Sequence, residues 1–225
     1  MEYNITEIVS NIQNKDKISI SYIQRTFSFG FNKSNKIFHD LIEQGYIDAE
    51  GRVDKEKADP NYTKGPKVIF LDVDGVLNCR STKDKCGGYI GIDDEKVSLL
   101  KKIVDATGAI IILVSSWKEW WTNNPRYKPR QNEMATYLDE KLAKQGLVIR
   151  DKIRDGSSFG KGKGILRFIE IQKEIGIDIR KYVILDDETF DYSEIKMTRH
   201  LIRTSFEQNG LEKKHVRKAI EKLLK

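Results

Sequence analysis

Three apolar, β-branched runs that each end in polar residues constrain the fold of this chain more than any other feature. They are VIFLDVDG at residues 68–75, AIIILVSSW at 109–117 and YVILDDE at 182–188. Runs of this kind are typical of strands buried on both faces of a parallel sheet. Segments with helical spacing separate them, and a shorter run, HLIRTS, is a further candidate strand. The alternation predicts an α/β fold with a parallel sheet and helices on both of its faces.

The polar residues at the ends of these runs indicate a site for a metal ion and a phosphate. Parallel strands place their carboxyl ends at one edge of the sheet, where open α/β sheets bind ligands. Carboxylates, a hydroxyl and a lysine suit Mg²⁺ and phosphate better than an organic cation. An Asp-Gly turn is the simpler explanation of Asp74, but it does not explain Asp72. The residues expected at this edge are Asp72, Asp74, Ser115, Lys161, Asp186 and Asp187.

The motifs DVDGVLN, ILVSS, a lysine ahead of a helix, and VILDD resemble those of the haloacid dehalogenase (HAD) superfamily, whose members are mostly phosphohydrolases. Within it, the stretches FLDVDGVLN, LVSSWK, KGKGILRFIE and YVILDDE resemble the compact HAD domain of multidomain RNA repair proteins. The resemblance implies a HAD-like Rossmannoid sheet over nearly all of residues 66–225. It also implies a minimal cap at the two places where caps are inserted. The loop 79–93 is too short for a domain, and the segment 118–160 contains one expected helix, around NEMATYLDEKLAKQG.

The resemblance implies a role for each residue of the expected site. Asp72 would be the nucleophile that forms an aspartyl-phosphate, and Asp74 the general acid and then the general base. Ser115 and Lys161 would stabilise the transferring phosphoryl group, with Lys163 as an alternative to Lys161. The second aspartate of DVD favours hydrolysis of a phosphate ester.

A Mg²⁺ cofactor is expected, because hard divalent cations prefer oxygen ligands. Its expected ligands are Asp72, Asp74 through its carbonyl oxygen, and Asp186 or Asp187.

An uncapped site is open to large substrates, which favours phosphorylated nucleic-acid ends over sugar phosphates. The expected substrate-binding residues are Asn78, Ser116, Trp117 and Lys118. Trp117, Trp120 and Trp121 either form a stacking platform for a base or pack beneath the site.

Residues 1–60 carry a different pattern, with three short helical segments followed by a hairpin around Glu50 and Gly51, which predicts a small winged-helix domain. Residues 61–66 are the expected linker, and 67–225 the HAD-like phosphatase domain. The stretch KISISYIQRTFSFGFNKSNKIFHDLIEQGYI resembles the γ domain of FtsK-type DNA translocases. That resemblance implies DNA contacts from Asn32, Lys33 and Lys36 on the third helix. Use of the domain for protein contacts is the alternative, since it has nine basic residues against ten acidic ones in residues 1–65.

The net charge of +6 is concentrated in particular segments. Residues 196–225 hold nine basic and three acidic residues, and residues 117–154 hold nine and five. A basic surface of this kind favours a nucleic-acid partner, although a solvated helix face is the ordinary explanation. The alternatives to a phosphatase for nucleic acids are a winged-helix DNA-binding regulator with a phosphate-sensing or inactive HAD domain, and a protein phosphatase.

The remaining features narrow the cellular context. No apolar stretch approaches the roughly 18 residues of a membrane span, and the first residues lack a signal, so we expect a cytoplasmic protein without membrane contact. Cys79 and Cys86 suggest reduced thiols, with a cysteine nucleophile as a remote alternative. The histidines are expected at the surface: His39, His200 and His215. The oligomeric state has no signature in the sequence.

Overall fold

The computed structural model describes residues 3–59, 63–154 and 160–225. The chain divides into two compact units, Met1–Lys64 and Gly65–Lys225. Residues 61 and 62 of the expected linker lie outside the described residues. Each unit has its own hydrophobic core, and they are described separately.

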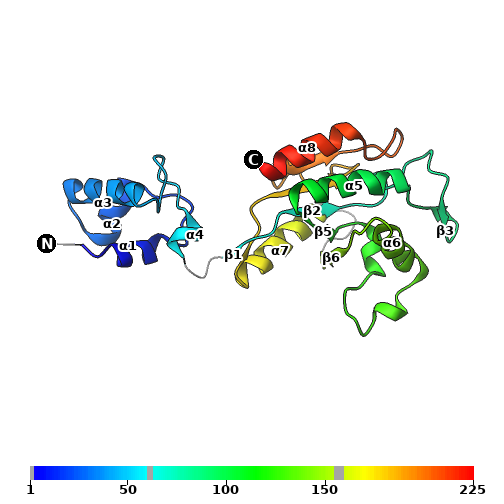
Figure 1. The fold of residues 1–225 in the computed structure, drawn as a ribbon, viewed down its shortest axis with the longest axis horizontal. Coiled ribbons are helices and arrows are strands. Elements are labelled where there is room, and N and C mark those ends of the chain that lie inside the picture. Colours follow the sequence, from blue (N-terminus) through cyan, green and yellow to red (C-terminus); the bar gives the residue numbers. More distant parts are fainter. Residues whose placement is uncertain (1–2, 60–62, 155–159) are drawn as a thin grey trace. The chain divides into compact units, whose positions relative to one another are not determined.

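The first unit begins with three helices, α1 (Ile5–Ile12), α2 (Ile20–Phe27) and α3 (Phe31–Glu43) (Figure 1). The side chain of Asn4 caps α1 by accepting a hydrogen bond from the Thr6 amide, and Ser19 caps α2 through the Tyr22 amide. Such caps satisfy amides that the first helical turn leaves without partners. A short helix, α4 (Lys55–Ala58), and a two-residue strand, β1 (Thr63–Lys64), complete the unit.

The predicted hairpin around Glu50 and Gly51 exists as isolated antiparallel pairings rather than regular strands. Ile47 pairs with Val53 across the turn, and Lys17, which precedes α2, pairs with Arg52. Gly51 has a φ of +77°, and a Cβ there would lie 2.3 Å from the Ile18 carbonyl oxygen, so the turn requires glycine. Three helices and a paired turn are the content of a winged helix, but that identity stays a prediction.

The second unit is built on a five-stranded sheet in the order β6-β5-β2-β8-β9. Every neighbouring pair is parallel, which confirms the predicted α/β fold. The strands are β2 (Val68–Leu71), β5 (Ile110–Leu113), β6 (Ile149–Lys152), β8 (Tyr182–Asp186) and β9 (Leu201–Arg203). Strand β6 was not predicted, because its sequence, IRDK, is mostly charged, as an edge strand permits.

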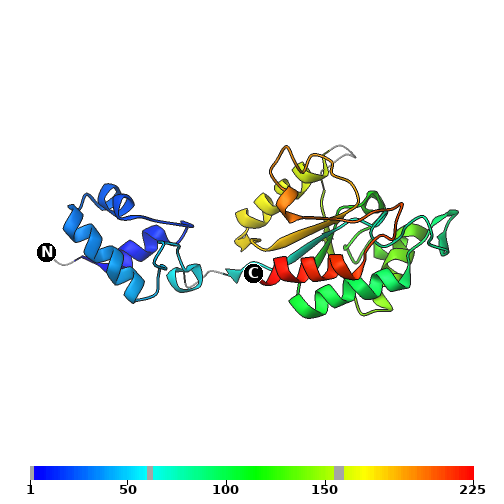
Figure 2. The same ribbon diagram turned by 90° about the horizontal axis from the view of Figure 1, so that it is seen from above.

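Helices cover both faces of this sheet, as Figures 1 and 2 show. Ile69 and Leu71 of β2 belong to the core shared with α5 (Asp94–Thr107), α6 (Glu133–Ala143) and α8 (Lys213–Leu224). Val68 and Phe70 belong to the core on the other face, which α7 (Lys161–Glu174) covers. Alternate residues of one strand therefore fill two cores, which explains why the run is apolar throughout.

The loop predicted at residues 79–93 contains a small hairpin, formed by β3 (Lys85–Cys86) and β4 (Tyr89–Ile90). Gly87 and Gly88 form its two-residue turn with φ values of +53° and +88°. Positive φ at both positions is what a tight hairpin turn needs, so the two glycines were an overlooked signal. The short elements that remain are η1 (Ser116–Glu119), η2 (Lys128–Arg130), β7 (Ile177–Asp178) and η3 (Thr198–His200).

Candidate active site

Three adjacent strands bring the predicted polar residues together at one edge of the sheet. Leu71 of β2 is in register with Leu113 of β5 and with Leu185 of β8. The next residues continue this pairing, because the Asp72 amide donates to the Leu185 carbonyl oxygen at 2.9 Å. Asp72 and Asp186 therefore lie side by side on neighbouring strands.

Three carboxylates form the centre of the site. Asp72, Asp186 and Asp187 each offer an oxygen, and these oxygens lie within 4.8 Å of one another. Asp72 is 5% exposed and Asp186 is fully buried. Burial, with the neighbouring charge of Asp186, raises the pKa of Asp72 to about 6. Burial also raises the pKa of Asp186 and of Asp187.

Lys161 is the cation that the structure places among these carboxylates. Its Nζ lies 3.1 Å from Asp72 Oδ2 and 3.0 Å from Asp186 Oδ2. Burial acts to lower the pKa of Lys161, but the two carboxylates outweigh it and raise that pKa. Lys163, the alternative in the sequence, is exposed. The choice between the two lysines was open because they differ by only half a helical turn.

The residues fit a divalent cation such as Mg²⁺. The donors are hard carboxylate oxygens, and one lysine is too little positive charge for three buried or half-buried carboxylates. Burial raises the pKa of all three acids, and neighbouring carboxylates raise it further for Asp72 and Asp187. A bound Mg²⁺ would offset the negative charge of the three carboxylates.

Asp74 lies at the first turn after β2, where two side chains hold its carboxylate. Trp117 Nε1 donates to Asp74 Oδ2 at 3.0 Å, and Asn78 Nδ2 donates to Asp74 Oδ1 at 2.8 Å. The Asn78 oxygen in turn accepts from the Gly75 amide at 2.9 Å. Asn78 is fully buried and Trp117 is 3% exposed. These contacts orient Asp74, and the expectation that both residues also contact substrate stays a prediction.

The other predicted residues of the serine motif have different environments. Ser115 is fully buried, and its hydroxyl acts with Lys161 to lower the pKa of Asp72, against the stronger effect of burial. Ser116 is exposed beside Asp74. Lys118 is 6% exposed and pairs with Glu119 at 3.0 Å, so it is held within η1.

Sequence reasoning missed two residues that organise the site. Asp191 accepts hydrogen bonds from the amides of Gly162 and Lys163, at 2.7 and 3.0 Å, and so caps the start of α7, where Gly160 offers no side chain. Tyr192 donates to Asp186 Oδ2 at 2.9 Å. The signal available for Asp191 was a further acid close behind the Asp186 pair and a helix start without a capping residue.

The tryptophans and histidines are not uniform in their exposure. Trp121 is 1% exposed and donates to Asp139 at 2.8 Å, whereas Trp120 is 50% exposed.

The prediction that all histidines lie at the surface is wrong for His215, which is 6% exposed. Its Nδ1 accepts from the Glu212 amide as part of the cap of α8, a local role that spacing alone does not show.

The residues predicted to bind nucleic acid lie on α3 of the first unit. Asn32 and Lys36 are exposed, and Lys33 is half-buried with its Nζ 4.0 Å from the centre of the Phe29 ring. Lys33 therefore has a partner within its own unit.

Two further expectations concern cysteines and membranes. Cys79 and Cys86 are both buried and free of disulfides. Over the ranges that the structure covers, no helix combines the length and the apolar composition that crossing a bilayer needs.

A parallel α/β sheet with aspartates clustered at neighbouring strand ends defines the second unit as a HAD-like fold. Comparison with protein families matches residues 68–216 to the HAD domain in Swiss Army Knife RNA repair proteins. Because the match covers more than half of the chain, the chain belongs to this family, which indicates a HAD-type hydrolase. No curated protein matches the chain.

Proposed function

We propose that the chain is a Mg²⁺-dependent phosphohydrolase that acts on phosphorylated nucleic-acid ends through an aspartyl-phosphate. The observation that carries this proposal is the convergence of Asp72, Asp186 and Asp187 on one point beside Lys161. The family's place in RNA repair proteins supports nucleic acid as the substrate class.

In the first step, a carboxylate oxygen of Asp72 attacks phosphorus, and the bond from phosphorus to the leaving oxygen breaks. Asp74 gives its proton to that oxygen as it leaves. Lys161 and Ser115 are near enough to Asp72 to stabilise the charge on the transferring phosphoryl group.

In the second step, Asp74 takes a proton from a water molecule, whose oxygen attacks the phosphorus of the aspartyl-phosphate. The bond to Asp72 breaks, so inorganic phosphate leaves and the carboxylate is regenerated. Trp117 and Asn78 hold the Asp74 carboxyl in one orientation for both proton transfers. A bound Mg²⁺ would supply positive charge that lets an anionic phosphate approach the acids.

Phosphate release from short DNA and RNA strands with a 3′ or a 5′ phosphate, with and without Mg²⁺, tests the proposal. We expect Mg²⁺-dependent release by the wild type and none by Asp72→Asn. Full activity in Asp72→Asn would refute the aspartyl-phosphate. Tight, salt-dependent DNA binding without turnover would instead favour the regulator.

We further propose that the first unit contributes nucleic-acid contacts through α3. The exposure of Asn32 and Lys36 supports this proposal, whereas Lys33 is half-buried against the Phe29 ring and would have to leave it to reach a phosphate. Replacing all three by alanine in the full chain should weaken binding of an oligonucleotide and reduce its salt dependence. Unchanged binding would leave protein contacts as the use of this unit.

A further inference from the structure

A cavity of about 460 Å³ lies next to Asp74 in the second unit. Its wall includes four large apolar side chains from separate parts of the chain, with Asp74 and Ser116 as polar groups: Tyr89, Trp120, Met134 and Phe206. Its volume falls within the roughly 300–1,000 Å³ of small-molecule sites. Asp74 is the proposed proton donor to the leaving oxygen. The part of the substrate attached to that oxygen would therefore lie next to this cavity.

Two of the aromatic residues in this wall are unusually exposed. Tyr89 is 65% exposed and Trp120 is 50% exposed. The neighbouring Trp117 and Trp121 are both buried and hydrogen-bonded to carboxylates. Trp117 also lines the cavity, but Trp120 is the member of the trio with half of its surface exposed.

The hairpin that carries Tyr89 is firmly attached to α6. The hydroxyl of Tyr137 donates to Asp84 at 2.9 Å and accepts from the Ile92 amide at 2.8 Å, so it ties both ends of the hairpin to the helix. Lys141, which also lies on α6, forms ion pairs with Asp84 and Asp94. Because the hairpin is fixed, Tyr89 is already held beside the cavity. A ligand that binds there does not have to order the hairpin, so the entropic cost of binding is smaller.

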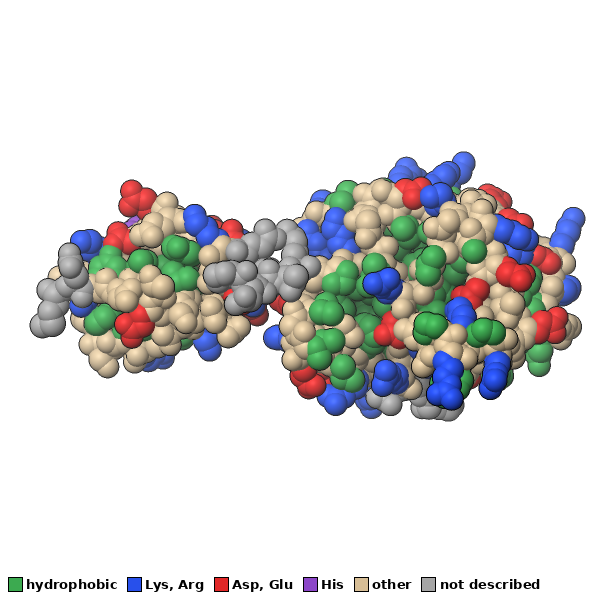
Figure 3. Space-filling model, turned by 60° about the horizontal axis from the view of Figure 1, so that its bottom comes forward, with side chains coloured by type: hydrophobic (Ala, Val, Ile, Leu, Met, Phe, Trp, Pro, Cys, Tyr) green, Lys and Arg blue, Asp and Glu red, His purple; other side chains and the backbone are tan. Residues whose placement is uncertain are grey.

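The segment that supplies two residues of this wall is rich in basic residues, although the charged group that lines the cavity itself is Asp74. Trp120 and Met134 belong to the segment 117–154, which holds nine basic and five acidic residues. Figure 3 shows Lys and Arg side chains among exposed hydrophobic ones on the face of this unit that lies at the bottom of Figure 1. A negatively charged strand with flat aromatic bases matches both properties.

We propose that the cavity binds the base of the nucleotide that carries the phosphate, with the base stacked on Trp120 and Tyr89. The inference rests on the proposed phosphohydrolase function and narrows its substrate to an unpaired terminal nucleotide, because a base that enters this cavity cannot remain in a duplex. Exposed aromatic rings accept any base, so the expected recognition is tolerant of sequence.

The test compares single strands that differ only in the terminal base. One carries a normal phosphorylated nucleotide at its end, and the other an abasic phosphorylated residue. The wild type is expected to prefer the base-bearing end. Trp120→Ala and Tyr89→Ala should each reduce that preference, as a ratio of kcat/KM values, by roughly 5- to 150-fold.

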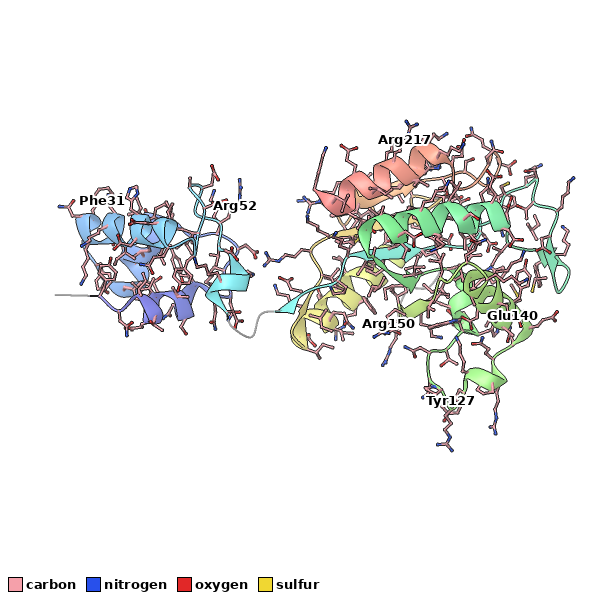
Figure 4. The ribbon with its side chains drawn as sticks, viewed as in Figure 1. Phe31, Arg52, Tyr127, Glu140, Arg150 and Arg217 are labelled. Carbon is pink, nitrogen blue, oxygen red and sulfur yellow. The ribbon has the colours of Figure 1, made fainter. Side chains whose placement is uncertain are left out.

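Tyr127→Ala is the matched control, because Tyr127 is 51% exposed and lies at the tip of a loop that points away from the sheet (Figure 4). This variant should prefer the base-bearing end over the abasic end to the same extent as the wild type. Equal hydrolysis of the two ends by the wild type would overturn the inference, as would an unreduced preference in both cavity variants. A stronger preference for phosphotyrosine than for either strand would overturn it in favour of a protein substrate.

A binding measurement separates this inference from the hydrolytic mechanism. Without Mg²⁺, 3′- and 5′-AMP should quench the tryptophan fluorescence of the wild type, and ribose 5-phosphate should not. Tyr89→Ala should weaken AMP binding, again by roughly 5- to 150-fold. If AMP binds in this way but no substrate is hydrolysed, the proposed function fails and the base site stands. If AMP does not bind, the base site fails whatever the enzyme hydrolyses.

Discussion

Gly75 offers a direct test of the carboxylate cluster, because its missing side chain leaves space for Asp187. Its φ is +73°, and a Cβ there would lie 2.2 Å from Asp187 Cγ and 2.3 Å from Asp187 Oδ2. These distances are far below van der Waals contact, so Gly75→Ala must displace the Asp187 carboxylate. A left-handed backbone costs a further 1–2 kcal/mol or so for an alanine.

Gly108→Ala isolates the backbone cost from the clash. Gly108 caps the C-terminus of α5 with a φ of +67°, and no atom of the described residues lies within 4 Å of a Cβ placed there. Both variants should lose about 1–2 kcal/mol of unfolding free energy from the backbone alone. Only Gly75→Ala should also lose function, with the Mg²⁺ concentration for half-maximal activity raised about 10- to 100-fold.

The measurements are urea unfolding for stability and phosphate release over a Mg²⁺ titration for function. A Gly75→Ala enzyme with the Mg²⁺ response of Gly108→Ala would refute the reasoning. It would mean that the position of Asp187 has no part in holding the cation.

Other substitutions test the remaining parts of the site. Lys161→Met should reduce kcat about 100-fold or more, since it removes the cation between two buried carboxylates, while Lys163→Met should not; equal effects on phosphate release would contradict the assignment. Asp191→Ala removes the cap of α7 and should cost about 0.5–2 kcal/mol in urea unfolding, with a lower kcat because Lys161 follows the helix start; an unchanged unfolding midpoint would count against the cap. Hydrogen bonds from Lys141 and Tyr137 lower the pKa of Asp84, so their stabilisation is complete above the ordinary aspartate pKa of about 4 and is lost as the pH falls through the lower folded value. Thermal unfolding from pH 6 to pH 2 should therefore show a smaller acid-dependent loss in Lys141→Met than in the wild type; the same loss in both would contradict this account.

The sheet was predictable because each central strand is buried on both faces, so its whole length is apolar. Each of the four runs predicted to be strands contains one, at 68–71, 110–113, 182–186 and 201–203. Strand β6 and the hairpin of β3 and β4 were not predicted, because an edge strand and a surface hairpin bury little and so leave a weak hydrophobic pattern. The hairpin is held instead by Tyr137, which lies 53 residues from its partner Asp84.

The site shows the same division. The presence of Asp72, Asp186 and Asp187 at strand ends follows from the order of the elements along the chain. The hydrogen bonds from Trp117 and Asn78 to Asp74 do not follow, since a linear pattern does not show which side chains meet in the folded chain.

The sequence by itself determined which residues end the buried strands. A strand covered on both faces is apolar along its whole length, so it ends where the apolar run gives way to polar residues. Only the tertiary structure decided which lysine enters the carboxylates, which tryptophan remains open, and which acid caps α7. Those outcomes depend on distances of about 3 Å between groups far apart in the chain, and such distances are set by the packing of whole elements rather than by any local run of residues.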